Sequence, residues 1–197
     1  MPHPSTAPYS AAARNGVLGL LRGDHDRVLE EFREFDRLES LAADQACQRV
    51  VQRTFAELKV LASVEQQLFY PAVHEAIAGT DLIDQSQIEH ARILRLIDEL
   101  EEAEPMQPRY RHSFRTLGEY VRRHVYDEER ELYPVLSTAQ VDWQALYEQM
   151  TSRRAELAED LGVPDLNAEH EDDDSDATDE FETVEDDERE LAMEGQH

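Results

Sequence analysis

The sequence predicts an all-α protein: an up-down-up-down four-helix bundle with a short extra helix and a disordered acidic C-terminal tail. Between Leu18 and Pro134, glycine and proline are sparse, while Leu, Glu, Arg and Ala, which favour helices, are abundant. Apolar residues recur there in alternating steps of three and four, which is the spacing of one helical face. Short breaks separate the stretches, so we expect consecutive helices to be antiparallel neighbours.

The helix and domain limits follow from these breaks. Breaks are expected near Ala42-Ala43-Asp44, Gly79-Thr80-Asp81 and Glu104-Pro105-Met106. The expected helices run over residues 16–41, 45–78, 82–103, 108–137 and, for the shorter one, 140–160. As domains, we expect a flexible N-terminus at 1–15, the bundle with its appended helix at 16–160, and the tail at 161–197.

The tail is the most acidic part of the chain. From Asp165 onward there are about 16 acidic residues and a single basic one, Arg189. The run from Glu169 to Asp176 has no apolar residue to bury and repels itself, so we expect it to be disordered. It is either a solvated extension, or a weak collector of cations or docking arm for a basic protein partner.

Charge and composition exclude several classes of function. The net charge of -26 opposes binding to nucleic acid or to an anionic membrane, so we expect neither partner. The longest apolar run, Val17 to Leu21, is too short for a membrane span, and no basic region precedes it, so no signal peptide is expected either. Cys47 is the single cysteine, which excludes an internal disulfide and fits a cytoplasmic location.

An ionisable residue interrupts the apolar stripe of each long helix. These residues are His25, Glu65, His90, and the pair His124 and Glu128, which lie four apart on one helical face. We expect the apolar stripe to continue after Glu65 through Leu68 and Ala72, and after Glu128 through Leu132 and Val135. Around His90, the expected stripe includes Gln87 and Leu94. At about 1.5 Å per residue, measured from the breaks, all five ionisable residues fall within about two helical turns of one level.

Five such residues at one level predict a metal site. Burying two carboxylates and three imidazoles without compensation is costly, and a cation among them removes that cost. The histidine and carboxylate set suits iron, manganese or zinc better than calcium or magnesium. Two alternatives stay open at this point: hydrogen-bonded core histidines, and a buried polar network that shares protons without a metal.

Four segments resemble the hemerythrin-like HHE cation-binding domain over residues 16–137. They are Gly23-Asp24-His25-Asp26, Glu65-Gln66-Gln67-Leu68-Phe69-Tyr70-Pro71, Ile88-Glu89-His90, and the run from His124 to Pro134 with its Glu128 and Tyr133. The resemblance implies a diiron site with oxygen binding, oxygen sensing, iron handling, or nitric-oxide and peroxide chemistry. It implies that His25 serves one iron, His90 and His124 serve the other, and Glu65 and Glu128 bridge them.

The sequence departs from the family pattern at one ligand. The pattern has His-x-x-x-Glu on the second helix, but the residue four before Glu65 is Leu61, which cannot coordinate a metal. We therefore expect the two metal positions to differ in metal affinity. Water or Glu57 could replace the absent histidine ligand, but the simpler expectation is that Glu57 is an exposed carboxylate. His74 and His112 are expected on the surface. The tyrosines near the ligands, Tyr70, Tyr126 and Tyr133, are expected to pack against the bundle wall rather than to line the site.

Three functions remain open on the sequence. One is a non-haem iron protein that binds or senses oxygen or another diatomic gas, or handles iron. Another is a metalloenzyme that processes peroxide or a nitrogen oxide at an open metal position. The third is a degenerate bundle that serves as an interaction module. A ferritin-like carboxylate bundle is disfavoured, because the residues three before His25, His90 and His124 are not glutamate.

Overall fold

The computed structural model describes residues 10–77 and 81–163. Most of the expected flexible N-terminus and the acidic tail from residue 164 onward lie outside these ranges. Every regular element within them is a helix, which confirms the all-α prediction. None of the helices in this part of the chain has the length and apolar character that crossing a membrane would require.

The helical elements follow the expected order, with two interruptions by wide π-helical turns. They are α1 (Ala11–Ser40), α2 (Asp44–Val64), the first π turn (Glu65–Phe69), α3 (Tyr70–His74), α4 (Leu82–Glu101), α5 (Pro108–Asp127), the second π turn (Glu128–Leu132), α6 (Tyr133–Val135) and α7 (Trp143–Asp160). A short 3-10 turn, Leu136–Thr138, follows α6. Each π turn continues the helix before it, so α2 with α3 and α5 with α6 form two long rods.

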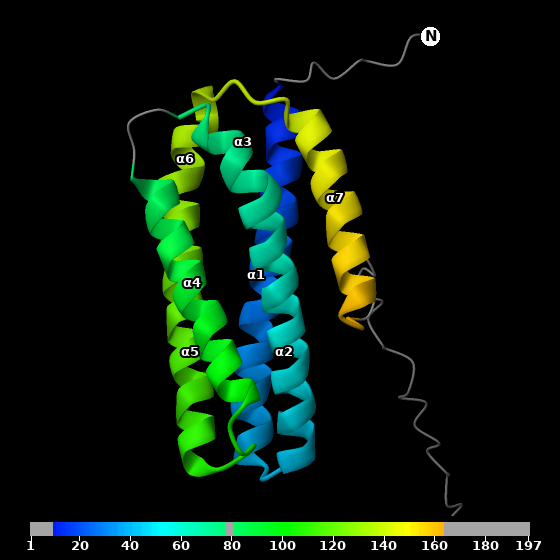
Figure 1. Cartoon of the computed structure of the whole chain (residues 1–197), viewed down its shortest axis with the longest axis vertical. Helices are drawn as coiled ribbons and strands as arrows, with labels where there is room; N and C mark the ends of the chain where they lie inside the picture. The colour runs from blue at the N-terminus through cyan, green and yellow to red at the C-terminus, as the bar shows by residue number, and fades with distance from the viewer. Residues whose placement is uncertain (1–9, 78–80, 164–197) are drawn as a thin grey trace, which may run out of the picture. The chain divides into compact units, whose positions relative to one another are not determined.

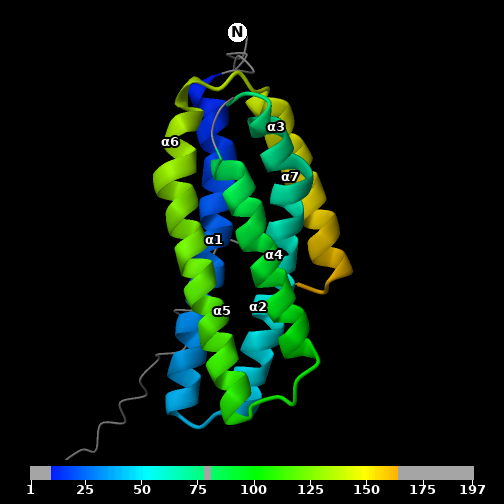
Figure 2. The same cartoon turned by 60° about the vertical axis from the view of Figure 1, so that its left-hand side comes forward.

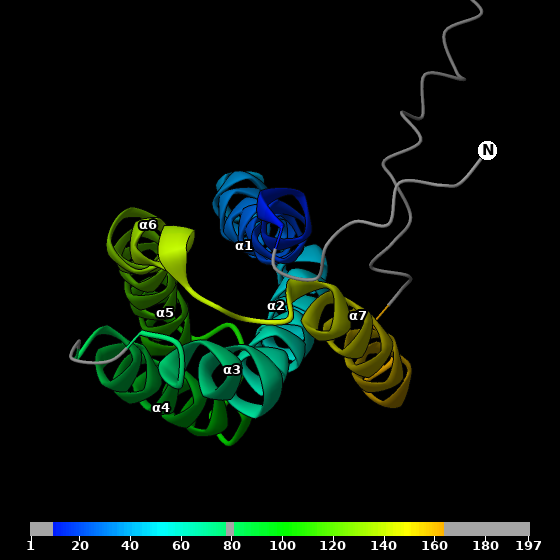
Figure 3. The ribbon, with the colours of Figure 1, turned by 90° about the horizontal axis from the view of Figure 1, so that it is seen from above.

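The four long rods form the predicted up-and-down bundle (Figure 1). α1 packs against α2, and α4 packs against α5, as the short links between them require. Turning the bundle shows α4 and α5 in front of α1 and α2 (Figure 2). Seen from above, α7 lies outside the four rods, next to α1 and α2 (Figure 3).

Helix ends follow local capping chemistry. α1 begins at Ala11, earlier than the expected residue 16, because the Ser10 hydroxyl accepts a hydrogen bond from the Ala13 N–H at 3.1 Å. α7 begins at Trp143, where Asp142 accepts from the Ala145 N–H at 3.1 Å. Such N-terminal caps satisfy amide groups that have no partner within the helix.

Each π turn starts at one of the two inward glutamates and shifts the buried face that follows. The Tyr70 N–H donates to the Glu65 carbonyl, five residues back, and the Tyr133 N–H donates likewise to Glu128. The extra residue in each turn rotates the chain beyond it. Our prediction for these positions was therefore shifted by one residue. Phe69, Val73 and Leu136 are buried, whereas Leu68 and Ala72 are half-buried against the core and Val135 is exposed.

A proline accompanies each π turn. Pro71 and Pro134 each lie six residues after the glutamate that opens the turn. Proline has no N–H to donate, and in a regular α-helix its ring collides with the carbonyl four residues earlier. A widened turn relieves that crowding without ending the helix. The repeated Glu and Tyr-Pro spacing therefore accounts for both turns.

The stripe of α4 also differs from the prediction. Its buried residues are Ile83, Ser86, His90, Ile93, Ile97 and Leu100, so Ser86 and Ile93 replace the expected Gln87 and Leu94. These residues follow one another in steps of three and four throughout, as a straight helix requires. The change leaves the Gln87 amide in solvent and buries only a small hydroxyl, which is the less costly arrangement.

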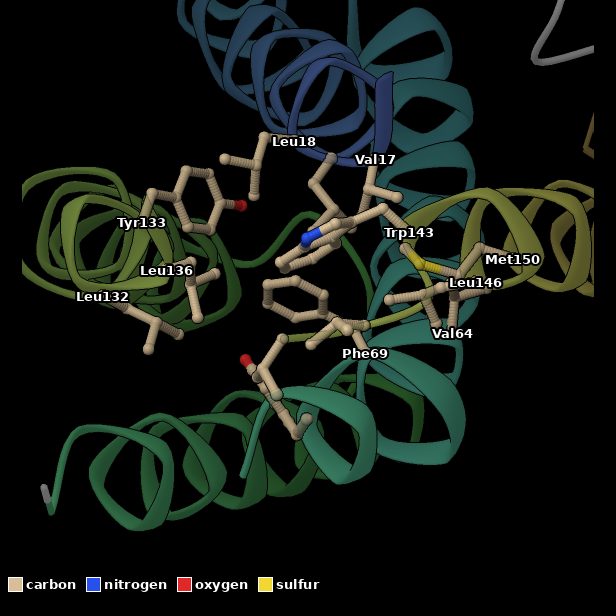
Figure 4. Packing of buried hydrophobic residues seen from close by; sticks show 14 of the residues in the cluster. Val17, Leu18, Val64, Phe69, Leu132, Tyr133, Leu136, Trp143, Leu146 and Met150 are labelled. Carbon is tan, nitrogen blue, oxygen red and sulfur yellow. The ribbon is translucent and has the colours of Figure 1, made fainter. Parts of the chain in front are cut away.

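Within residues 10–77 and 81–163, the apolar core consists of two clusters. The first includes Leu18, Leu21, Val64, Phe69, Leu136 and Trp143, and the second includes Val28, Phe32, Leu58, Ile97 and Phe114. Figure 4 shows Phe69, Leu136 and Trp143 of the first cluster directed into the space between the rods and α7. A layer of buried polar residues separates the two clusters.

Gly118 sets the distance between α5 and α1. A Cβ atom at this position would lie 2.9 Å from the Phe32 ring, which is buried and packs 4.9 Å from the Phe114 ring.

Gly118→Ala should lower the free energy of unfolding by about 1 kcal/mol, because the clash outweighs the gain in helix propensity. Gly19→Ala, at an exposed position with open space around it, should raise it by a similar amount. Urea denaturation of both variants tests this, and a stabilised Gly118→Ala would contradict the close approach.

Candidate metal centre

A layer of polar residues lies between the two apolar clusters. On α1, His25 lies between Leu21 of the first cluster and Val28 of the second, and on α4, His90 lies between Ile83 and Ile93. The residues of this layer, which we call the central cluster, are all buried: His25, Glu65, His90, His124 and Glu128. The structure thus brings together all five residues that the sequence singled out.

On one side of the central cluster, His25 faces both glutamates. Its Nε2 lies 3.6 Å from Oε1 of Glu65 and 3.6 Å from Oε2 of Glu128. Neither contact is a hydrogen bond, and the three side chains offer ligand atoms that lie within 4.8 Å of one another. This group can hold a metal ion.

The other side is formed by His90 and His124. The Nε2 atoms of these two rings are 2.8 Å apart, and His90 Nε2 lies 3.1 Å from Oε2 of Glu65. Glu65, His90 and His124 form a second group with ligand atoms within 4.8 Å of one another. Glu65 belongs to both groups, and Glu128 Oε2 lies 3.9 Å from His124 Nε2, so both carboxylates lie between the two sets of histidines.

Several buried polar atoms of the central cluster have no hydrogen-bond partner. They are Nε2 of His25, both carboxylate oxygens of Glu65, Nδ1 of His90 and Oε2 of Glu128. A buried polar atom without a partner is costly, so such atoms are rare in folded proteins. Their donor types, imidazole nitrogen and carboxylate oxygen, are those that transition metals bind, so these residues fit a metal ion.

Two carboxylates outside the central cluster hold the outer nitrogens of His25 and His124, whereas Nδ1 of His90 has no hydrogen-bond partner. Oε1 of Glu129 lies 3.1 Å from Nδ1 of His25, and Oε2 of Glu89 lies 3.1 Å from Nδ1 of His124. These hydrogen bonds lower the pKa of both glutamates. A carboxylate at Nδ1 keeps a proton there, so Nε2 is the nitrogen that would bind a metal ion once its own proton is displaced.

The charges of the central cluster compensate one another in part. Burial opposes protonation of His25, but the hydrogen bond with Glu129 and the nearby Glu65 and Glu128 outweigh it and raise its pKa to about 10. Burial likewise raises the pKa of Glu128, to about 7, with the Glu65 charge adding to the effect. Burial also opposes ionisation of Glu65, yet His25 and His90 lower its pKa well below the usual range. The site therefore favours positive charge beside its two carboxylates.

Tyr70 is a member of the site that the sequence analysis assigned to packing. Its buried hydroxyl donates a hydrogen bond to Oε1 of Glu128 at 2.5 Å and lies 3.2 Å from Nε2 of His90. Tyr133 stacks on His25 at 6.4 Å between ring centroids, whereas Tyr126 is exposed. Tyr70 points inward because the first π turn rotates the chain by one residue. The Tyr-Pro pair five and six residues after each glutamate was the available signal.

The structure settles the position of the other candidate residues. Leu61 is buried and offers no donor atom. Glu57 is buried too, with 7 % of its surface exposed, so the expectation of an exposed carboxylate was wrong. It belongs to neither metal-holding group. The positive charges of Arg27 and Arg53 lie close enough to favour its ionised form. His74 and His112 are exposed, as predicted.

Glu57 should make stability depend on pH. Burial, with the nearby Glu31 charge, raises its pKa from 4.5 to about 7. The folded protein therefore binds this proton more tightly than the unfolded chain, and stability falls as the pH rises from 4.5 to about 7. Glu57→Gln removes this loss, so above about pH 7 it should stabilise the fold by about 2 kcal/mol after allowance for solvent screening. Denaturation of parent and variant across this pH range measures it, with exposed Glu119→Gln as the control. A constant difference between parent and Glu57→Gln would contradict the assignment.

A helical bundle with two internal histidine and carboxylate groups of this geometry defines a class of cation-binding protein. The family model of the hemerythrin HHE cation-binding domain matches residues 17–136, which is more than half of the chain. The protein therefore belongs to this family, and the resemblance of its sequence motifs is confirmed. Comparisons with curated proteins and with solved structures gave no match. α7 lies beyond the matched residues.

Proposed function

We propose that the central cluster binds non-haem iron, and that the protein binds or senses oxygen or another diatomic gas, or handles iron. The observation that carries this proposal is the set of buried donor atoms on His25, Glu65 and Glu128 that have no hydrogen-bond partner. A cation among them compensates the two buried carboxylates, and the family is one of cation-binding domains. Manganese and zinc are the other metals that this ligand set accepts.

The two groups divide the proposed ligands. His90 and His124 with Glu65 hold one iron, and His25 with Glu65 and Glu128 holds the other. Leu61 leaves the His25 side with one protein ligand fewer than the family pattern offers. We therefore expect the His90 side to fill first and the His25 side to fill incompletely, which gives a partly occupied or mononuclear centre at low iron.

The surrounding residues prepare the site for a small ligand. Ferrous iron in such a set supplies electrons and a replaceable coordination position. The apolar clusters on both sides exclude water. Glu89 and Glu129 keep protons on the outer histidine nitrogens, and the Tyr70 hydroxyl donates to Glu128, which orients that carboxylate.

A second function is favoured by two observations. Leu61 offers no donor where the family pattern has a ligand, so a bound metal would keep one position open for a small substrate, and Tyr70 places a hydroxyl proton inside the site. Both suit an enzyme that processes peroxide or a nitrogen oxide. Docking of a basic partner to the acidic tail and a cytoplasmic location stay predictions from the sequence, and the tail lies outside the described residues.

Metal analysis followed by gas exposure tests the proposal. Protein purified from iron-rich cultures should contain iron in excess of manganese and zinc. After anaerobic reduction, oxygen should change the absorption spectrum reversibly, and steady loss of added peroxide would instead favour the enzyme. Protein that contains no iron and takes none up would contradict the proposal and favour a degenerate bundle.

A further inference from the structure

The helix beyond the matched domain carries a buried charge. α7 buries Trp143, Leu146, Met150, Arg154 and Ala158, which follow one another in steps of three and four. Arg154 thus occupies a position on an otherwise apolar stripe, and 2 % of its surface is exposed. A guanidinium so deeply buried needs a carboxylate partner.

That partner is Asp24 of α1. Nε of Arg154 lies 3.0 Å and 2.9 Å from the two Asp24 oxygens, and Nη2 lies 2.6 Å from Oδ1. Asp24 is 4 % exposed and also pairs with Arg27. The planar guanidinium fork fixes the orientation of a carboxylate in a way that a point charge cannot.

Asp24 directly precedes His25, the proposed ligand. Successive helical residues are about 100° apart around the axis, so a fixed Asp24 side chain sets the rotation of α1 at His25. The His25 ring is held at Nδ1 by Glu129, and its Nε2 faces Glu65 and Glu128. A small rotation of α1 at this point would move Nε2 away from both carboxylates.

The main contacts of α7 lie on the His25 side of the proposed centre. α7 packs against α1, α2 and the first π turn, which carry His25, Leu61 and Glu65 (Figures 1 and 3). His90 and His124 come from α4 and α5. The ligand-poor side of the proposed centre is therefore the side that α7 supports.

We propose that Arg154 is a positioning residue for the His25 side of the centre, acting through Asp24. The inference rests on the iron site proposed above. Arg154→Met keeps a flexible, unbranched apolar stem, shorter than arginine, and removes the guanidinium fork. The loss of metal affinity should therefore fall on the iron served by His25. Positioning groups behind a ligand typically change metal affinity by about 10-fold to 100-fold.

Release of iron to a chelator tests the proposal on the full-length, iron-loaded protein. In His25→Ala, the phase of iron release that comes from the His25 side should disappear. This variant therefore identifies that phase in the parent protein. Arg154→Met should speed this phase by about tenfold and leave the other phase unchanged, and Arg154→Lys should restore part of the parent rate. Arg153→Met is the matched control, since its side chain is partly exposed and pairs with Glu156 and Gln67, and it should match the parent. Equal acceleration of both phases in Arg154→Met, or no change, would overturn the proposal.

A measurement on the metal-free protein separates this inference from the iron proposal. The Nδ1 proton that His25 shares with Glu129 should give a slowly exchanging NMR signal in the parent and in Arg153→Met. Arg154→Met should broaden or lose that signal while retaining the helical circular dichroism spectrum. If Arg154→Met does not fold, Arg154→Lys serves instead, with a weakened signal expected. An unchanged signal in the variant that folds would overturn the positioning role, whether or not the parent binds iron.

Discussion

Replacing Leu61 with histidine should raise the iron content of the protein while weakening its metal-free fold. The change places a histidine one helical turn before Glu65, the proposed ligand that opens the π turn continuing α2. A buried imidazole in place of leucine costs about 2 to 5 kcal/mol through lost packing and an unpaired polar ring. A new metal bond on the His25 side compensates that cost. Iron per chain and the melting temperature, each measured with and without iron, test the prediction.

Leu58→His is the matched control for this substitution. Leu58 is also buried on α2, but it belongs to the second apolar cluster and lies two turns before Glu65. We expect it to weaken the fold by a similar amount without any gain in iron. If Leu61→His binds no more iron than the parent and is destabilised equally in both conditions, residue 61 does not face the metal, and the family pattern does not extend to this position.

Glu128→Gln should remove most of the iron and leave the metal-free protein folded. The substitution keeps the size of the side chain and removes one of two carboxylates that are buried close to the same histidine. Without metal, the loss of that repulsion should preserve or raise stability. With metal, the loss of a charged ligand should weaken iron binding by more than about tenfold. Metal analysis after dialysis, together with thermal unfolding in the presence of a chelator, separates the two effects.

Glu57→Gln is the appropriate comparison for Glu128→Gln. Both glutamates are buried, and the chemical change is identical, but Glu57 lies in neither metal-holding group. It should retain the iron of the parent. Equal iron loss in the two variants would show that the proposed division between ligands and bystanders is incorrect.

The sequence was sufficient to locate the central cluster because the signal is local and periodic. His25, Glu65 and His90 each interrupt an apolar stripe, and the helical period alone assigns them to the inner face. Short links then place them at one level, since antiparallel rods of equal rise per residue bring equally spaced residues together. The absence of a donor at Leu61 was equally visible, because it needs only the four-residue spacing to Glu65.

The residues that the sequence analysis misplaced depend on the details of the turns. A uniform period of 3.6 placed Leu68 and Val135 inside, whereas the π turns bury Phe69 and Leu136 and direct Tyr70 to Glu128. The shift is a single residue in each case, and it arises where a proline must be accommodated within a helix. Hydrophobic periodicity cannot detect it, because both neighbouring residues are apolar or aromatic.

The sequence by itself determined the helical bundle, the inward ionisable residues and the absence of a donor at Leu61, because each depends on spacing within one helix or across a short link. Only the tertiary structure decided which residues support them. Glu57 is buried because α2 packs against α1, and Arg154 meets Asp24 across a separation of 130 residues. Such contacts form between side chains of different helices, and their geometry follows from how the side chains of all the helices pack together.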